Sequence, residues 1–333
     1  FDLPYIKDFF SNKNSYIWEI LKKLYFPESI YSFSVFSSAI LGNIYETFLS
    51  ETVSIIDGKP KRIPKPENVD RDIVTTPIHI VRDIIRKTLT PRLDQKDASE
   101  ILSTRVADIS CGSGAFLLEA YQLMHDTLVD YYIEHDKKQL DQIGINSFKL
   151  TFDRKKQLLT NCIFGVDKDY GATQACKFGL LLKLLEGEKA ETIGPSVPAL
   201  PILDNNIQCG NSLIDSSMST SIIVHEINPY QFGSDKFDVI IGNPPYLKTE
   251  DMKNLMLTEF NLYKENYTSA YQQFDKYFLF VERALQLLSD DGLMGYILPL
   301  KFMKVAAGKR LRELLSVNKY VSDITSFGAT QVF

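Results

Sequence analysis

The sequence has little that would link it to a metal or to an oxidising compartment. Its four cysteines, Cys111, Cys162, Cys176 and Cys209, are far apart and form no C-x-x-C pair. This spacing favours buried free thiols over a zinc site or a disulfide framework. We therefore expect no metal site.

Long apolar runs and a secretory signal are also missing. No apolar stretch is long and uninterrupted enough to cross a bilayer. The first residues, Phe1-Asp2-Leu3-Pro4, lack the basic head and small-residue cleavage site of a signal peptide. The sequence thus predicts a cytoplasmic protein without a membrane partner.

An excess of basic residues is absent as well. The 37 lysines and arginines face 42 acidic residues, for a net charge of -5. A surface that wraps nucleic acid needs clustered Lys and Arg to contact phosphates. If the chain acts on nucleic acid, we expect a separate domain to carry much of the nucleic-acid-binding surface.

The chain is long enough for one large α/β domain and a smaller lobe, and 44% of its residues are hydrophobic. Over residues 1–50 apolar side chains recur every three or four positions, which predicts an N-terminal helical lobe over 1–70. The lobe should end in a hairpin, because Asp57-Gly58 suits a tight turn. Asp57-Gly58-Lys59 could instead be half of a nuclease D-x-K pattern, but no partner carboxylate can be placed, so the turn is favoured.

Residues 71–333 alternate short apolar strands with amphipathic helices, which predicts a mostly parallel, doubly wound α/β sheet. The expected strands are 105–109, 162–166, 207–209, 237–241, 293–298 and 320–325. The clearest expected helices are 114–135, 169–186, 270–289 and 307–316. Glycine and proline mark 187–205 as a long loop.

Polar residues follow three of these strands. Ser110-Cys111-Gly112-Ser113-Gly114 forms a glycine-rich turn that lets the backbone approach a ligand, but it lacks the full dinucleotide pattern. Asp167 ends the second strand, where a carboxylate can accept hydrogen bonds from a ribose. An insertion around 136–160 must separate the two. Asn211 follows the third strand and could meet an adenine edge or simply make a turn.

The fourth strand leads into Asn243-Pro244-Pro245-Tyr246. Consecutive prolines fix φ and remove two N–H donors, which leaves a stiff loop rich in acceptors. Such a loop suits a planar amine: the Asn243 oxygen and the Pro244 carbonyl can accept its protons, so that its lone pair can attack a methyl group. Tyr246 offers an aromatic face for stacking.

These motifs, in this order, resemble the gamma-class DNA adenine-N6 methyltransferases, especially the methyltransferase part of type IIG restriction-modification enzymes. Thr75-Thr76-Pro77 is similar to the family's upstream motif, and Asp323-Ile324 with Phe327-Gly328 and Val332-Phe333 resembles a segment after the sixth strand. The resemblance covers roughly residues 35–333. It implies a Rossmann-like class I fold that uses S-adenosylmethionine.

The resemblance also implies roles for individual residues. The methionine end of the cofactor would lie against Thr76, Pro77, Asp108, Ser110, Gly112 and Gly114. Asp167 would hold its ribose and Asn211 its adenine amine, although many members of the family carry Asp in place of that Asn. The catalytic and substrate-binding loop for the target adenine would consist of Asn243, Pro244, Pro245 and Tyr246.

A base in a duplex cannot reach such a loop, so the resemblance implies that adenine is flipped out of the double-stranded DNA. In the family a target-recognition domain follows the catalytic motifs, and we expect it beyond residue 333, in another domain or subunit. A restriction nuclease domain or subunit is a further expected partner.

Other functions also use an Asn-Pro-Pro-aromatic loop. Protein glutamine and RNA guanine methyltransferases are the main enzyme alternatives, and the acidic charge favours them slightly. Cytosine-N4 methylation is a nearer alternative, although Asn rather than Ser at 243 favours adenine. A scaffold that has lost catalysis is the remaining alternative, against which the intact loop and Asp167 argue.

Overall fold

The computed structural model describes residues 16–23, 28, 51–64, 76–193, 200–215, 218, 230, 233 and 235–328. Most of the predicted N-terminal lobe lies outside these residues, as do Thr75 and Val332-Phe333. The described parts of residues 1–70 include helix α2 (Tyr16–Lys23) and strands β1 (Glu51–Ile56) and β2 (Lys59–Pro64). The division into a lobe over 1–70 and a domain over 71–333 stays a prediction.

Strands β1 and β2 form the expected hairpin. They pair antiparallel, with Ile56 opposite Lys59, across a two-residue turn. Asp57 and Gly58 both adopt positive φ, 55° and 71°, as such a turn requires. In the described part of the chain, no group of three or more His, Cys, Asp or Glu residues could hold a metal ion.

The centre of the molecule is a parallel sheet with the order β7-β6-β3-β8-β9. Its strands are β3 (Val106–Asp108), β6 (Ile163–Asp167), β7 (Ile207–Cys209), β8 (Phe237–Gly242) and β9 (Leu288–Tyr296). The chain first extends the sheet from β3 through β6 to β7 and then returns to the other side of β3. The order therefore reverses beside β3, where doubly wound sheets open a crevice at the carboxyl ends of their strands.

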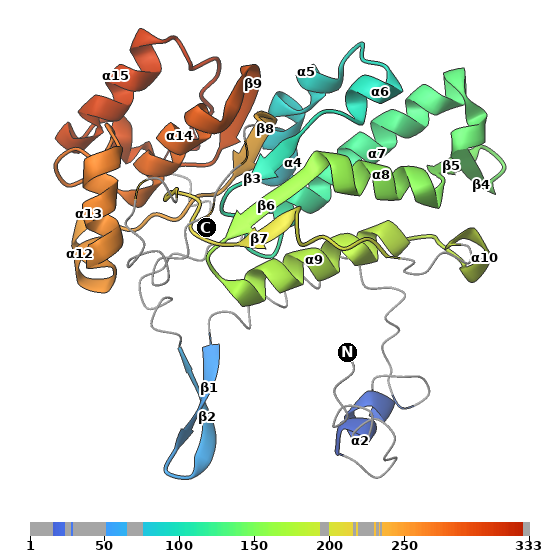
Figure 1. Ribbon diagram of the computed structural model, residues 1–333, viewed down its shortest axis with the longest axis horizontal. Helices are drawn as coiled ribbons and strands as arrows, with labels where there is room; N and C mark the ends of the chain where they lie inside the picture. Colours follow the sequence, from blue (N-terminus) through green and yellow to red (C-terminus); the bar gives the residue numbers. More distant parts are fainter. Residues whose placement is uncertain are drawn as a thin grey trace.

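Helices cover both faces of the sheet, as Figure 1 shows. Alternate residues at the end of β8 point to opposite faces: Val239 and Ile241 join one apolar cluster, and Ile240 joins the other. The first cluster is covered by α4 (Ile78–Thr88), α5 (Thr90–Leu93), α6 (Ala98–Ile101), α7 (Ala115–His135), α8 (Phe152–Cys162) and α9 (Tyr170–Leu185). The second is covered by α12 (Thr249–Leu255), α13 (Leu257–Asn266), α14 (Lys276–Leu287) and α15 (Lys309–Val317). The predicted doubly wound α/β architecture is confirmed.

The expected insertion between the first two sheet strands is a hairpin and a helix. A short 3-10 helix, η3 (Lys137–Gln139), leads into β4 (Leu140–Gly144) and β5 (Ser147–Leu150), which pair antiparallel ahead of α8. The predicted loop at 187–205 contains a short helix, α10 (Ala190–Ile193), and residues 194–199 lie outside the described chain. Two 3-10 helices, η5 (Leu300–Met303) and η6 (Ala306–Gly308), follow β9.

The predicted strand at 320–325 is wrong. These residues are exposed and belong to no strand; Lys87 holds the segment by an ion pair to Asp323 at 3.0 Å and a hydrogen bond to Thr325 at 2.8 Å. A short segment with apolar residues does not by itself form a strand, because the backbone also needs a neighbouring strand with which to exchange hydrogen bonds. The predicted helix at 270–289 is also too long, since β9 begins at Leu288.

The cysteines fit the sequence-based expectation. None is in a disulfide; Cys111, Cys162 and Cys176 are buried, and Cys209 is half-buried. Among the residues that the structure describes, no helix combines the length and the apolar character needed to span a bilayer.

Candidate functional site

The glycine-rich loop after β3 has the backbone that its sequence predicts. Gly112 and Gly114 have positive φ, 52° and 93°, and Gly114 precedes the first residue of α7. A Cβ on Gly114 would lie 2.5 Å from Cys176 Sγ, so no larger residue fits there without movement. A Cβ on Gly112 would meet no atom within 4 Å, so the loop faces open space at that point. A tight turn that faces open space suits a bound ligand.

Asp167, at the end of β6, joins this loop directly. Its Oδ2 accepts a hydrogen bond from the Gly112 backbone N–H at 2.9 Å, and its Oδ1 accepts one from the Asp169 N–H at 2.8 Å. Burial raises the pKa of the Asp167 carboxyl in spite of these bonds. The neighbouring Asp169 is the N-cap of α9, with Ala172 N–H as its donor. The structure thus brings the predicted ribose carboxylate and the glycine loop together.

Asp108, at the end of β3, is almost completely buried. Its Oδ1 accepts a hydrogen bond from the Ser110 N–H at 3.0 Å. Burial raises the pKa of this carboxyl to about 7. Gly242, at the end of β8, lies so close that a Cβ there would be 2.6 Å from Asp108 Oδ1. Glycine at 242 therefore allows the ends of β3 and β8 to touch.

Asn243 follows at once and is held on both sides. Its Nδ2 donates a hydrogen bond to Thr76 Oγ1 at 3.0 Å, and its Oδ1 accepts one from the Tyr246 hydroxyl. Thr76 is buried and lies two residues before α4, next to Pro77, whose carbonyl accepts from Ile80 N–H. The upstream motif and the Asn-Pro-Pro-Tyr loop, 167 residues apart in the chain, are thus in direct contact.

Tyr246 connects the loop to the neighbouring strand. Its hydroxyl oxygen lies 3.0 Å from the Ile297 carbonyl, and its ring meets that of Tyr277 edge-on, with centroids 5.9 Å apart. Burial raises the pKa of the Tyr246 hydroxyl, so it stays protonated and able to donate. Pro244 is buried and Pro245 half-buried. The loop is therefore rigid, as its two prolines predict.

Asn211 is buried, unlike the half-buried Asn243, and its amide is hydrogen-bonded at both the oxygen and the nitrogen. Only 2% of the residue is exposed. Its Oδ1 accepts from the Leu213 N–H at 3.1 Å, and its Nδ2 donates to Glu259 Oε2 at 3.0 Å. The predicted contact with an adenine amine stays a prediction, and any such ligand would also lie near Glu259.

Glu259 and Lys168 were not predicted from the sequence. Lys168 Nζ lies 2.7 Å from Glu259 Oε1, and α13 thereby reaches the loop that follows Asp167. The position of Lys168, directly after Asp167, was a usable signal. Glu259 belongs to no motif, and nothing in the sequence of α13 sets it apart from the exposed acids nearby.

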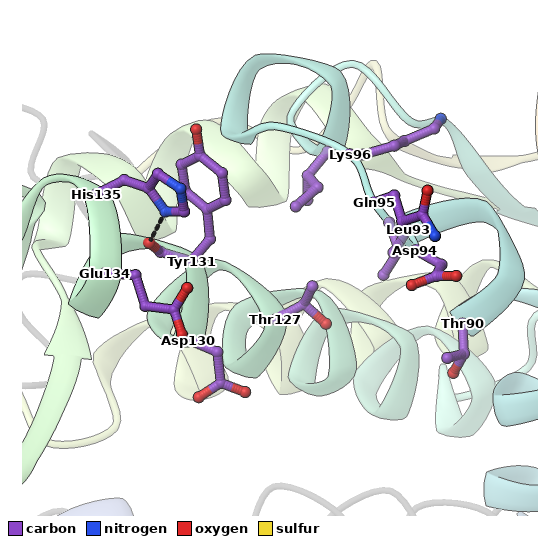
Figure 2. Close-up of a pocket in the computed structure, with 11 residues that line it drawn as sticks. Thr90, Leu93, Asp94, Gln95, Lys96, Thr127, Asp130, Tyr131, Glu134 and His135 are labelled. Carbon is purple, nitrogen blue, oxygen red and sulfur yellow. Dashed lines mark hydrogen bonds between the residues drawn. The ribbon is translucent and has the colours of Figure 1, made fainter.

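The structure also contains a separate pocket, whose lining residues are shown in Figure 2. It has a volume of about 460 Å³, between the α5–α6 segment and the last turns of α7. Its polar lining includes Asp94, Asp130, Glu134 and His135, whose Nδ1 is 2.8 Å from the Tyr131 carbonyl oxygen. Since α7 begins at the carboxyl end of β3, its last turns lie near the opposite edge of the sheet. None of the predicted site residues lines this pocket.

Comparisons with known proteins agree with this arrangement. The family model described as Eco57I restriction-modification methylase matches residues 161–333. The chain is 56% identical, over its full length, to the type II restriction enzyme and methyltransferase RM.Eco57I of Escherichia coli. It is 29% identical over 69% of its length to the type II methyltransferase M.BstVI of Geobacillus stearothermophilus. The chain spans about a third of the length of each, 34% in both cases.

The fold is also found in a solved structure. The ATP-dependent type ISP restriction-modification enzyme LlaBIII, solved bound to DNA, aligns with 93% of this chain and 20% of its own, with a TM-score of 0.56 and 13% identity. The Rossmann-like fold of class I methyltransferases, predicted from the motifs, is confirmed. The chain belongs to the Eco57I restriction-modification methylase family.

Proposed function

We propose that this chain transfers a methyl group from S-adenosylmethionine to N6 of an adenine in DNA, as the catalytic part of a restriction-modification enzyme. One observation carries the proposal: the glycine loop after β3 and the Asn243 loop after β8 meet at Asp108 and Gly242. A methyl donor held by the first loop would lie next to an amine held by the second.

The described residues fit such a cofactor. Gly112 faces open space, and Asp167 holds two acceptor oxygens beside it, each with one donor in the hydrogen bonds described above. When bound, S-adenosylmethionine supplies an electrophilic methyl group on a sulfonium centre. The glycine loop would hold its methionine end, together with Thr76, and Asp167 its ribose.

The Asn243 loop would bind and orient the target amine. An exocyclic amine is a poor nucleophile because its lone pair is delocalised into the ring. The Asn243 oxygen and the Pro244 carbonyl can accept its two protons, which directs the lone pair towards the methyl group. Thr76 and Tyr246 fix the orientation of the Asn243 amide, so its oxygen is in place before the substrate binds. The exposed part of the Tyr246 ring is the proposed stacking surface.

The relatives support DNA as the substrate. RM.Eco57I is both a restriction enzyme and a methyltransferase, and LlaBIII was solved bound to DNA. We infer that double-stranded DNA is gripped mainly by a recognition domain or subunit outside these residues, since the net charge is -5. The adenine would be flipped into the loop. A nuclease partner and a cytoplasmic location remain predictions.

The proposal is tested with the full-length protein and labelled S-adenosylmethionine. Double-stranded DNA, ribosomal RNA and a release-factor-like protein are offered as methyl acceptors, and the methylated nucleosides are identified by mass spectrometry. We expect N6-methyladenine in DNA. Methylation of the protein or RNA alone, or N4-methylcytosine as the DNA product, would refute the assignment.

Variants test the separate roles of Asn243 and Asp167. Asn243→Ala should lower methyl transfer about 100-fold or more, because it removes an acceptor for the amine, while cofactor affinity stays within about twofold. Asp167→Ala should instead act mainly by lowering the affinity for the cofactor. Asn318→Ala, at the exposed end of α15, is the matched control. Equal loss of cofactor affinity in the first two variants would contradict the proposed roles.

A further inference from the structure

Glu259 lies at the carboxyl ends of the sheet strands and contacts residues that follow two of them. Through its two oxygens it meets Lys168, which follows β6, and Asn211, which follows β7. The proposed function places the ribose of the cofactor at the end of β6, and the family resemblance implies that its adenine binds at Asn211, at the end of β7. Glu259 comes from α13, after β8, and therefore reaches the adenine end from across the sheet.

Asn211 is poorly suited to bind an adenine amine alone. Its Nδ2 is used as a donor to Glu259, and its Oδ1 already accepts from Leu213 N–H. The side chain is also buried. A neutral amide can offer either an acceptor or a donor, whereas an ionised carboxylate can only accept. Glu259 is therefore the better hydrogen-bond acceptor for an amine that binds here.

Glu259 is held rigidly. Tyr263, one turn further along α13, donates to Oε2 at 2.8 Å and is itself completely buried. Burial opposes ionisation of Glu259, but the charges of Lys168 and Lys276 outweigh it and lower the pKa of the carboxyl. The group is therefore an ionised acceptor at neutral pH, and it does not depend on the ligand for its position.

Glu259 also has capacity for one more donor. A carboxylate can accept about four hydrogen bonds. Among the described residues, Oε2 accepts from Asn211 and Tyr263, and Oε1 from Lys168 alone. Some 11% of the side chain remains exposed. One acceptor position on Oε1 is thus left for a ligand.

We propose that Glu259 is the residue that selects the adenine of the cofactor, by accepting a hydrogen bond from its 6-amino group. This inference rests on the proposed function. A hypoxanthine base in the same place would present its 6-carbonyl oxygen to the carboxylate. Two hydrogen-bond acceptors that face each other repel. The protein should therefore reject a cofactor analogue whose adenine is replaced by hypoxanthine.

The test compares two ligands by calorimetry with the full-length protein: S-adenosylhomocysteine and S-inosylhomocysteine. The wild type should prefer the first by about 10- to 100-fold, as expected for a hydrogen bond to a charged group. Equal affinity for both ligands would overturn the inference without touching the proposed function. Binding of neither ligand would instead count against the proposed function itself.

Three variants distinguish recognition of the adenine by Glu259 from a purely structural role of this residue. Glu259→Gln should reduce the preference to about threefold or less, because its amide can also donate to the inosine carbonyl. Tyr263→Phe disturbs the same network but keeps the carboxylate, so its preference should remain. Glu265→Gln, on the exposed side of α13, should match the wild type. If Glu259→Gln weakened both ligands equally, or if Tyr263→Phe lost the preference as well, Glu259 would be only structural.

Discussion

Glu188 and Glu259 are both largely buried carboxylates that contact lysine, but they belong to different parts of the molecule. Glu188 lies 2.5 Å from Lys149 Nζ and 2.6 Å from Lys155 Nζ, and 1% of its side chain is exposed. Glu259 meets one lysine and two neutral donors. Glu188 is held by two ammonium groups and by the Thr192 hydroxyl and is almost completely covered, whereas Glu259 has one lysine partner and keeps 11% of its side chain exposed.

Their locations explain the difference. The Glu188 cluster joins β5, α8 and the end of α9, where Lys155 Nζ also donates to the Glu186 carbonyl at 2.8 Å. Of these elements, β5 and α8 belong to the insertion between β3 and β6, and all three are distant from the Asn243 loop in the sequence. Glu259 lies over the ends of β6 and β7. Buried charge thus connects elements in one region and prepares a binding surface in the other.

The largest effect on stability is expected from Glu188→Ala. It leaves two buried ammonium groups without their shared carboxylate, which should lower the free energy of unfolding by about 3–5 kcal/mol. Chemical denaturation measures this, with the exposed Glu191→Ala as the control. Cofactor affinity of the folded variant should not change. A stable Glu188→Ala protein with impaired cofactor binding would contradict the assignment of a purely structural role to Glu188.

Asp108→Asn should give a smaller effect that depends on pH. The folded-state pKa of Asp108, about 7, lies above its ordinary value of 3.8. The folded protein therefore holds a proton that the unfolded chain has lost, so stability falls as pH rises from about 4 to about 7 and is then constant. The variant escapes this loss and should gain about 3 kcal/mol over the wild type across that interval. Denaturation curves at pH 5, 6, 7 and 8 test it, and a constant difference would exclude this role for Asp108.

The smallest expected effect comes from Thr76→Val, which removes the acceptor for the Asn243 amide and preserves side-chain shape. Methyl transfer at saturating cofactor should fall about tenfold, the value of one hydrogen bond. Thr76→Ser keeps the hydroxyl and should remain within about twofold of the wild type. Equal rates in the two variants would show that Thr76 does not position Asn243.

Much of the site was predictable because its residues follow strands directly. Gly112, Asp167 and Asn243 are marked by a strand, a turn and a polar residue in a fixed order, and parallel strands bring their carboxyl ends to one edge. The absence of a strand at 320–325 was not predictable in this way. The segment contains the apolar residues Tyr320, Val321 and Ile324, but pairing depends on neighbours that a local pattern does not contain.

The sequence by itself determined the doubly wound sheet, the rigid loop at Asn243 and the residues at the strand ends, since these follow from local periodicity and from the restricted φ of proline. Only the tertiary structure decided that Thr76 would hold Asn243 and that Glu259 would reach Lys168 and Asn211. These contacts join residues far apart in the chain. They depend on how α4 and α13 pack against the sheet, which no local pattern specifies.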